Sequence, residues 1–541
     1  MLSSAQKSTI LPARFTLPEV SLPPVLPTGA VALTALLHAQ QQAHDASHQQ
    51  ALDYINHLFE QMVLLRHRQF GSSSELLSAQ GRLFDEAEAL AADTTEAQDF
   101  APTAPDAGKA PAGIKARGKR APLPFELPRV EIVHDVPEAE RTCPCGTPMV
   151  VIGQETSEQL DIVPMQIRVL RHVRNTYGCP AGEHAPVTAP LPAQPLPKSN
   201  ASPDFLAMLL SVKFIDGLPL ARFEYVLERH GVKVPRQTLA RWVIGASHLL
   251  QPLHNLMRDA LFDGAFIHMD ETVVQVLKEK DKSPTSNSYM WVQSGGPPDK
   301  PVVIYDYDPS RSGAVPSRLL SGYQGYLMTD GYDGYNTLAR TEGIEHLVCW
   351  AHVRRKFVEA TRVQAKGKKG RADEALALIG QLYGVERKYK DAEDAERFLA
   401  RQSVSLSVLA ELREWLSKTR VAVVPGSALG RALSYMHAYW GKLIRYTERG
   451  DLPIDNNRCE NAIRPFVIGR KAWLFSDTPA GAHASAVIYS LLQTAKANGQ
   501  EPYTWLRRVM RDLPAAQTVE EVEALLPWNL HGLDLTSGMV C

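Results

Sequence analysis

The sequence lacks long apolar runs, since no stretch of about 18 residues is free of polar or charged side chains. This absence argues against a membrane-spanning helix. The first 30 residues are interrupted by proline and have neither the charged start nor the apolar core of a signal peptide. We therefore expect a cytoplasmic protein with no membrane partner.

Cysteine is scarce, with six in 541 residues, which is too sparse for a disulfide framework. An excess of one charge is also absent, because 58 Lys and Arg are balanced by 59 Asp and Glu. This balance excludes a uniformly basic nucleic-acid coat, so DNA contacts must come from local clusters. A solvated surface remains an alternative for each of three basic clusters: Lys115, Arg117, Lys119 and Arg120; Arg354, Arg355 and Lys356; and Lys366, Lys368, Lys369 and Arg371.

Apolar residues make up 44% of the chain, enough for several cores, and the length suggests roughly three or four domains. After a flexible N-terminus (1–30), the spacing within 31–75 predicts a leucine-zipper-like coiled coil, and with it self-association. A helix packed inside its own domain would show the same spacing. Residues 76–125 hold the helix end and a flexible basic linker. The apolar positions that carry the coiled-coil prediction are Ala51, Ile55, Leu58, Met62 and Leu65.

Residues 126–190 resemble a small zinc ribbon. Cys143 and Cys145 form one close pair, and Cys179 with His184 offers a second. Structural zinc requires four such ligands in a tetrahedral array. The first pair is tighter than the usual Cys-x-x-Cys, and the second has one cysteine where two are usual. Bound Zn²⁺ and a metal-free remnant of the same fold both stay open.

Residues 200–255 are predicted to be helical and to contain a helix-turn-helix-like pair. Two helical patterns, Leu220–Arg229 and Pro235–Val243, are joined by a short turn that contains glycine. Any helical hairpin can show this pattern, so DNA binding here depends on what the rest of the chain does. Three side chains of the second helix would face a DNA groove: Arg236, Gln237 and Arg241.

Residues 256–371 alternate between strand-like and helix-like patterns. Helices are expected over Ala314–Leu320, between the fourth and fifth strands, and from Ala351. The order β, β, β, α, β, α, β, α is that of an RNase H-like α/β fold, in which acids on the first and fourth strands meet at one end of the sheet. The expected strands are Gly264–Leu277, Tyr289–Gln293, Pro301–Tyr307, Gly325–Thr329 and His346–Trp350.

Asp270 and Asp330 are the candidate acids of this fold. Asp270 lies in the middle of an apolar strand, where a carboxylate is costly to bury unless it is paired or binds a metal. Asp330 follows the fourth strand and precedes a glycine-rich turn. Phosphoryl transfer uses two hard cations about 4 Å apart, and carboxylates are preferred ligands of Mg²⁺ or Mn²⁺. For these two acids alone, capping of a helix or turn stays open.

A third acid follows late in the chain, in the run Asp455-Asn-Asn-Arg-Cys-Glu460. A helix is expected to begin near Asp455 and to bend or end at Pro465, with Glu460 and Arg464 on one face. An exposed Glu–Arg pair would not explain the dense polar run before Glu460. Glu460 could complete the metal site, while three basic side chains approach DNA phosphates: Arg464, Arg470 and Lys471.

Several motifs in order resemble the insertion-sequence-66 family of bacterial transposases, and the resemblance extends through nearly the whole chain. It implies a DDE triad at Asp270, Asp330 and Glu460, two Mg²⁺ or Mn²⁺ ions per site, double-stranded DNA as partner and companion proteins from the same element. Cys349 and His352 could suggest a metal pair, but a strand end that runs into a helix fits them better. The motifs are His268–Thr272, Thr329–Tyr335, Cys349–Phe357 and Asp455–Arg464.

The sequence therefore predicts a DNA transposase that cuts element ends and transfers the strands into target DNA. A regulator or inactive copy that binds the ends without cutting, and a metal-dependent nuclease that does not join, remain alternatives. The remaining segments are assigned as a helical insertion over 372–446, the last part of the core over 447–510, and a C-terminal segment over 511–541.

Overall fold

The computed structural model describes residues 29–70, 167–177, 187–340, 343–364 and 369–530. The predicted zinc ligands Cys143, Cys145, Cys179 and His184 lie outside these residues, as do the basic residues Lys115 to Arg120, Lys366 and Lys368. Thr95–Asn175 forms a unit separate from the rest of the chain. Its described residues, 167–175, contain neither helix nor strand.

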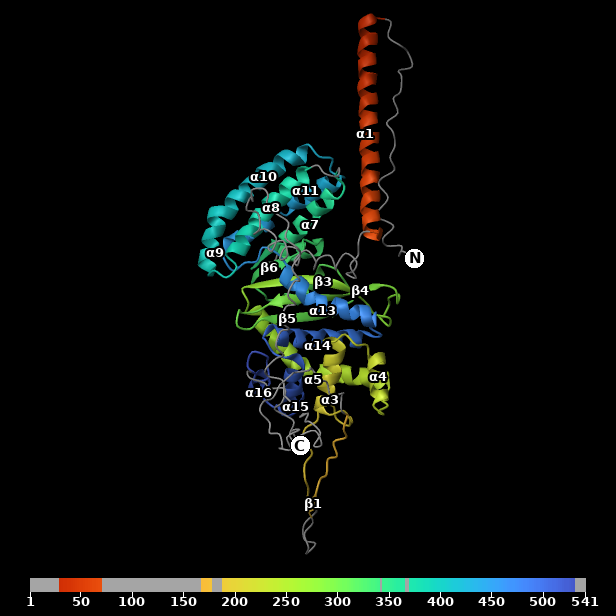
Figure 1. Ribbon diagram of the computed structural model, residues 1–541, viewed down its shortest axis with the longest axis vertical. Helices are drawn as coiled ribbons and strands as arrows, with labels where there is room; N and C mark the ends of the chain where they lie inside the picture. The colour runs from red at the N-terminus through yellow and green to blue at the C-terminus, as the bar shows by residue number, and fades with distance from the viewer. Residues whose placement is uncertain (1–28, 71–166, 178–186, 341–342, 365–368, 531–541) are drawn as a thin grey trace, which may run out of the picture. The chain divides into compact units, whose positions relative to one another are not determined.

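A mixed sheet of five strands lies at the centre of the larger unit, in the order β5-β4-β3-β6-β7 (Figure 1). The pairs β3–β4 and β4–β5 are antiparallel, whereas β3–β6 and β6–β7 are parallel. Most strand residues are buried, which suits the β-branched and aromatic composition of these segments. The five strands are β3 (Phe266–Gln275), β4 (Asn287–Gly295), β5 (Val302–Asp308), β6 (Gly325–Thr329) and β7 (Ile344–Val348).

Helix α14 (Pro479–Ala497) covers the edge strand β5. The Ser490 hydroxyl accepts from the backbone N–H of Tyr305 at 2.8 Å, and the Thr494 hydroxyl accepts from that of Val303 at 3.0 Å. An edge strand with free backbone donors invites pairing with another chain, and these hydroxyls satisfy two of them. Beside α14, α13 (Asn457–Trp473) packs on β3 and β4 (Figure 1).

A helical segment separates β7 from α13 and builds its own apolar core with residues of β6 and β7. The buried Arg401 holds it together: its guanidinium contacts both Glu386 oxygens at 2.6 and 2.9 Å and donates to the carbonyls of Tyr446 and Leu452. A buried charge is tolerated when it is paired and fully hydrogen-bonded in this way. Its helices include α7 (Trp350–Thr361), α8 (Arg371–Lys388), α9 (Asp394–Ala400), the π-helix η5 (Arg401–Ser405), α10 (Leu406–Val421), α11 (Ala428–Ala438), α12 (Trp440–Ile444) and η6 (Arg445–Glu448).

The remaining elements precede, follow or connect the strands of the five-stranded sheet along the chain. Strands β1 (Thr176–Tyr177) and β2 (Val187–Thr188) pair as a short antiparallel ladder on either side of residues 178–186. The other elements are α1 (Ala30–Phe70), α3 (Pro203–Phe214), α4 (Leu220–Arg229), α5 (Arg236–Phe262), α6 (Ala314–Leu319), η3 (Asp333–Asn336), η4 (Leu338–Arg340), α15 (Pro502–Asp512), η7 (Leu513–Ala515) and α16 (Val519–Glu523).

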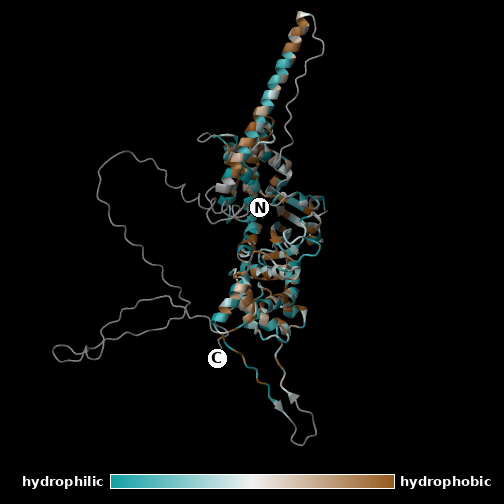
Figure 2. Cartoon of the chain, turned by 90° about the vertical axis from the view of Figure 1, so that its right-hand side faces the viewer, coloured by the Kyte–Doolittle hydropathy of each residue, from teal (hydrophilic) through white to brown (hydrophobic). Residues whose placement is uncertain are grey.

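Helix α1 covers the segment in which a coiled coil is predicted. It mixes hydrophobic and hydrophilic residues along its length (Figure 2). Four residues of the predicted seam are exposed in the single chain: Ile55, Leu58, Met62 and Leu65. Self-association through this seam stays a prediction. Among the described residues, no helix combines the length and the apolar composition that crossing a membrane requires.

Three local expectations differ from the structure. The helix expected between β6 and β7 consists, among the described residues, of the short 3-10 turns η3 and η4. Tyr335 in this segment donates to the Glu271 carboxylate of β3, which holds the chain against the end of the sheet. The helix that begins before Val243 continues through Pro252 to Phe262, because Leu253, Met257 and Leu261 are buried.

Helix α13 also continues past Pro465, where a bend or end was expected. Proline removes one helical N–H donor and leaves the carbonyl of Asn461 without its usual partner. Asn461 is exposed to solvent, and the Tyr305 hydroxyl donates to the neighbouring carbonyl of Ala462. Burial of Ile463 and Phe466 on either side then keeps the helix continuous.

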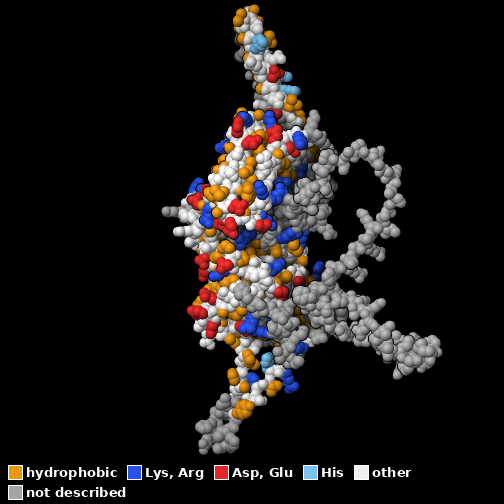
Figure 3. Space-filling view, turned by 60° about the vertical axis from the view of Figure 1, so that its left-hand side comes forward, with side chains coloured by type: hydrophobic (Ala, Val, Ile, Leu, Met, Phe, Trp, Pro, Cys, Tyr) orange, Lys and Arg blue, Asp and Glu red, His pale blue; other side chains and the backbone are white. Residues whose placement is uncertain are grey.

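The surface carries both charges. In the face that Figure 3 shows, basic and acidic side chains are interspersed over the described elements. This agrees with the formal net charge of −1. Contacts with a polyanion would therefore involve local groups of basic residues.

His346 of β7 is buried, and both of its ring nitrogens have hydrogen-bond partners. Lys442 Nζ donates to its Nδ1 at 3.0 Å, so Nε2 carries the hydrogen and donates to the Thr329 hydroxyl at 2.8 Å. Burial, with the charges of Lys442 and Arg445, lowers the pKa of His346 to about 3. Below the unfolded pKa of about 6.5, the unfolded chain binds a proton that the folded chain does not, so stability falls as pH falls.

We predict that His346→Gln destabilises the protein at pH 7.5, because a paired buried imidazole is replaced. Between pH 7.5 and pH 5, the difference in unfolding free energy between wild type and variant should shrink by about 2 kcal/mol, since only the wild type carries this penalty. Urea unfolding followed by tryptophan fluorescence measures both values. The exposed His230→Gln is the control, and an unchanged difference for His346→Gln at the two pH values would contradict the prediction.

Candidate active site

The parallel pairing of β3 and β6 brings Asp270 and Asp330 to the same level of the sheet. Phe266 pairs with Tyr326, and His268 pairs with Met328. Two residues further along each strand, the register reaches Asp270 and Asp330. The strand register thus supports the expectation that these two acids meet. The sequence could suggest this register only through the order of its strands and helices.

The loop after β6 fixes Asp330. Its carboxylate accepts from the backbone N–H of Tyr332 at 2.8 Å, and its carbonyl accepts from the Tyr435 hydroxyl of α11. The next residue, Gly331, has φ +80°, and its carbonyl accepts from the Tyr439 hydroxyl at 2.7 Å. A Cβ at Gly331 would lie 2.7 Å from the Tyr435 hydroxyl oxygen, so both backbone and space require glycine.

Helix α13 carries Glu460 in its first turn, with 3% of the residue exposed. The preceding Asn456, fully buried, sets the position of this turn. Its Nδ2 donates to the Met269 carbonyl of β3 at 3.2 Å, and its Oδ1 lies 3.0 Å from Nδ1 of His268. Its backbone N–H donates to the Cys349 sulfur at 3.1 Å. Asn456 therefore joins β3, the start of α7 and the start of α13.

Asp270 lies among the negative charges of other acids. Burial raises the pKa of Asp270 well above its usual value, and the negative charges of Asp330, Glu271 and Glu460 raise it further. Burial also raises the pKa of Asp330, opposed by the N–H of Tyr332 and by the charges of Arg311 and Lys356. A divalent cation would stabilise the ionised form of such buried carboxylates and so lower their pKa values. Their oxygens are the donors that Mg²⁺ or Mn²⁺ prefers.

Sequence reasoning gave no role to a third carboxylate beside this pair, that of Glu271. Its Oε2 accepts from the Tyr335 hydroxyl at 2.7 Å, and its Oε1 accepts from Arg311 Nε at 2.6 Å. Burial and Asp330 raise the pKa of Glu271, and Arg311 and Tyr335 oppose this. These paired contacts make Glu271 a support of the loop after β6. The glycine-tyrosine repeat of the loop was the available signal for Tyr335; none pointed to Arg311.

The predicted basic residues fall into groups. Lys356 of α7 lies near the acids: its charge lowers the pKa of Asp330, and its Nζ stacks 4.5 Å from the centre of the Tyr435 ring. Its neighbours Arg354 and Arg355 are half-buried. On α13, Arg470 donates to the Thr272 hydroxyl of β3 at 3.2 Å. Arg464 is half-buried and Lys471 is exposed.

The predicted helix-turn-helix corresponds to α4 and α5, which are joined by a short turn. The Glu224 carboxylate of α4 accepts from the first backbone N–H of α5, that of Arg236, at 3.1 Å. This contact fixes the angle between the helices at their junction. The three side chains expected to face DNA are exposed: Arg236, Gln237 and Arg241.

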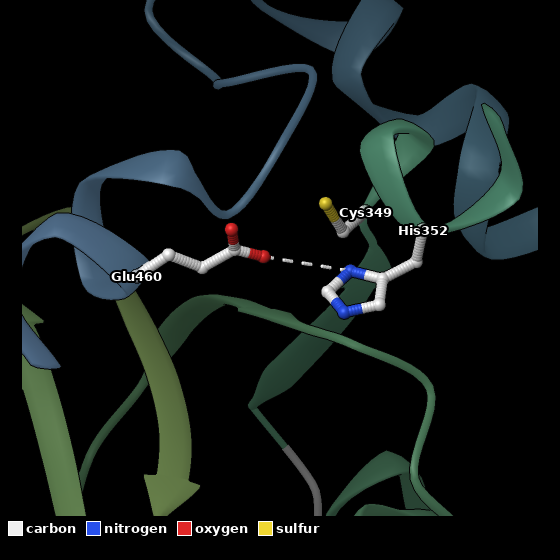
Figure 4. Close-up of side chains that lie close together, drawn as sticks. All are labelled: Cys349, His352 and Glu460. Carbon is white, nitrogen blue, oxygen red and sulfur yellow. Dashed lines mark ion pairs between the residues drawn. The ribbon is translucent and has the colours of Figure 1, made fainter. Parts of the chain in front are cut away.

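A cluster of different chemistry lies beside Glu460 (Figure 4). The Glu460 carboxylate and the His352 imidazole point toward one another from α13 and α7, with Oε1 and Nδ1 3.7 Å apart and the Cys349 sulfur next to them. The three donor atoms all lie within 4.8 Å of one another, so they could hold a metal ion. Burial, with the charges of Arg355 and Lys356, lowers the pKa of His352 to about 3.

Models of known protein families match most of the chain. The model described as Transposase IS66 family matches residues 198–484, which include the whole sheet and all three acids. Further models match 57–132 (Transposase C of IS166 homeodomain), 140–181 (zinc-finger binding domain of transposase IS66) and 490–528 (IS66 C-terminal element). The zinc-finger match includes Cys143, Cys145 and Cys179, and ends before His184.

Two relatives come from Sinorhizobium fredii. The uncharacterized protein y4jD is 31% identical, over 75% of this chain and 81% of its own. The uncharacterized protein y4qI is 32% identical, over 76% of this chain and 78% of its own. The similarity thus extends over most of both chains.

We predict that Asn456→Asp destabilises the protein by roughly 2–4 kcal/mol, because it leaves the Met269 carbonyl without its donor and adds a buried charge beside other acids. Chemical unfolding at pH 7.5 measures the effect. The matched control is Asn529→Asp, where an exposed amide donates to the Glu523 carbonyl at 2.7 Å. If Asn456→Asp lowers the unfolding free energy no more than the control does, Asn456 does not join β3, α7 and α13 as we infer.

Proposed function

The chain belongs to the IS66 family of insertion-sequence transposases, and we propose that Asp270, Asp330 and Glu460 form the DDE site with which it cuts and rejoins DNA. The observation that carries the proposal is the position of Asp270, which the parallel register of β3 and β6 places level with Asp330. Burial raises the pKa of Asp270, and the charges of Asp330, Glu271 and Glu460 raise it further. Two acids with raised pKa values, Asp270 and Asp330, near a third buried acid on another element are typical of a catalytic centre.

The sheet order supports an RNase H-like core. Three antiparallel strands followed by two parallel ones, in the order β5-β4-β3-β6-β7, correspond to that fold, with the acids on its first and fourth strands. In this assignment, the helices between β7 and α13 are an insertion into the core, and 447–510 completes it. The other segment boundaries given above, from the coiled coil to the C-terminal segment, are part of the same proposal.

Asp270, Asp330 and Glu460 would hold a pair of divalent cations, for which their oxygens are suitable donors. Such cations, when bound, neutralise charge at the attacking and leaving oxygens of a phosphodiester. The chain itself contributes position: β3, β6 and α13 hold the carboxyl groups in place before DNA arrives. The Lys356 charge near Asp330 and the Arg311 pair with Glu271 limit the repulsion among the acids.

DNA would reach this site along basic side chains. We assign phosphate contacts to Arg354, Arg355 and Lys356 on α7 and to Arg464, Arg470 and Lys471 on α13, and recognition of the element ends to Arg236, Gln237 and Arg241 on α5. We further propose that the chain self-associates through α1 and that the segment with Cys143, Cys145 and Cys179 binds Zn²⁺. We also propose that companion proteins encoded by the same element assist it and that it acts in the cytoplasm.

We predict that Asp270→Asn, Asp330→Asn and Glu460→Gln each reduce cleavage of element-end DNA by at least about a thousandfold, because each removes a charged ligand without changing the side chain's shape. Binding of the same DNA should be essentially unchanged. Gel assays of cleavage and of binding, with Mg²⁺ and with Mn²⁺, measure both.

The exposed Asp299→Asn in the β4–β5 loop is the matched control and should cleave normally. Near-normal cleavage by any of the three variants would contradict the triad. Wild-type protein that binds ends but cuts with neither cation would instead favour a regulator. Cleavage without joined products would favour a nuclease.

A further inference from the structure

Cys349 stands at the same sheet end as the acids, one strand further along. Thr329 of β6 pairs with Val348 of β7, and the backbone N–H of Cys349 donates to the Thr329 carbonyl at 3.0 Å. The next residue along β6 is Asp330. Asp270 within β3, Asp330 just after β6 and Cys349 just after β7 therefore lie at the same level of the sheet.

Cys349 and His352 form a Cys-x-x-His pair at the start of α7. Cys349 is the N-cap residue, and His352 lies in the first turn, three positions on, so the two side chains share one side of the helix. The Cys349 sulfur accepts the backbone N–H of Asn456. Burial and the charges of Asp455 and Glu460 raise the pKa of the Cys349 thiol well above its usual value, and the backbone N–H groups of Asn456 and His352 oppose this. A bound metal ion would have to displace the thiol proton.

Glu460 completes the group from the opposite side. Its Oε1 lies 3.7 Å from His352 Nδ1, which makes no hydrogen bond to any described residue. Ligands at about 2.0–2.3 Å from one tetrahedral ion are roughly 3.3–3.8 Å apart, close to this separation. The sulfur lies within 4.8 Å of both atoms, so small side-chain rotations would close the site (Figure 4).

We propose that Cys349, His352 and Glu460 together bind one divalent cation of the borderline class, such as Co²⁺ or Zn²⁺, beside the Asp270–Asp330 pair. This deepens the proposed function and rests on it, because Glu460 is the triad's third acid. The site would then be asymmetric: oxygen donors on one side suit a hard cation, whereas nitrogen and sulfur donors on the other disfavour Mg²⁺. A buried thiol at a helix cap would account for Cys349 alone, but not for a histidine nitrogen facing a carboxylate.

Cobalt binding tests the proposal directly, because Co²⁺ bound to a thiolate absorbs in the near ultraviolet. The full chain with Cys143→Ser, Cys145→Ser and Cys179→Ser lacks the three cysteines of the expected zinc segment. In this background we expect one thiolate-bound Co²⁺ per chain, measured by that band. Cys349→Ser should abolish the band, and His352→Ala should weaken binding at least about tenfold.

Two variants act as controls. Cys459→Ser alters another buried cysteine, whose sulfur donates to the Val292 carbonyl at 3.4 Å, and should keep the band. Asp270→Asn should also keep it, because Asp270 is not part of this ligand set. Thermal unfolding and circular dichroism of each variant establish that it is folded.

Cleavage assays separate this inference from the proposed function. With wild-type protein we expect faster cleavage in Co²⁺ than in Mg²⁺, and Cys349→Ser should lower that rate ratio at least about tenfold. A chain that cleaves DNA but shows no thiolate band, or a band unchanged by Cys349→Ser, overturns the inference and leaves the triad intact. A band lost in Cys349→Ser without cleavage in any cation would overturn the triad's function and leave the metal site standing.

Discussion

Repulsion among buried carboxyl groups is the constraint around which this fold is arranged. Asp270 lies within reach of the negative charges of Asp330, Glu271 and Glu460, and burial removes the water that would screen them. A fold that had only to be stable would not collect these groups. The sheet end tolerates them because Arg311 pairs with Glu271 and because Lys356 lies near Asp330. The remaining negative charge of the acids favours bound cations, and phosphoryl transfer uses such cations as well.

Two features of the backbone create this arrangement. The first is the parallel register of β3, β6 and β7, which puts Asp270, Asp330 and Cys349 at one level. The second is Asn456. Asparagine often caps a helix through its side chain, but the Asn456 side chain makes no such bond and donates to the Met269 carbonyl of β3 instead. Its neighbour Asp455 accepts from the backbone N–H of Asn457. The polar run before Glu460 is therefore a joint between sheet and helix, which explains why so many polar residues stand there.

Much of this could be predicted from the sequence, because strands and acids leave local signals. The five strands lie within about two residues of their expected positions, since β-branched and aromatic residues mark them. Non-local contacts left no such signal: the Arg311–Glu271 pair joins residues 40 positions apart, and the approach of Glu460 to His352 depends on how α7 and α13 pack. The passage of α13 through Pro465 was missed for the same reason, because it depends on the burial of Phe466 against Tyr305, which is far away in sequence.

The helical segment between β7 and α13 does more than lengthen the chain between the second and third acids. Tyr435 and Tyr439 donate to the carbonyls of Asp330 and Gly331, so α11 and its C-terminal residue hold the loop that carries one acid. Arg401 holds the carbonyls of Tyr446 and Leu452, which lead directly into the turn that carries Glu460. Trp350, beside Cys349, donates to the Leu443 carbonyl at 2.8 Å. A shift of this segment would therefore move the surroundings of Asp330, Cys349 and Glu460 together, which couples its packing to the geometry of the acids.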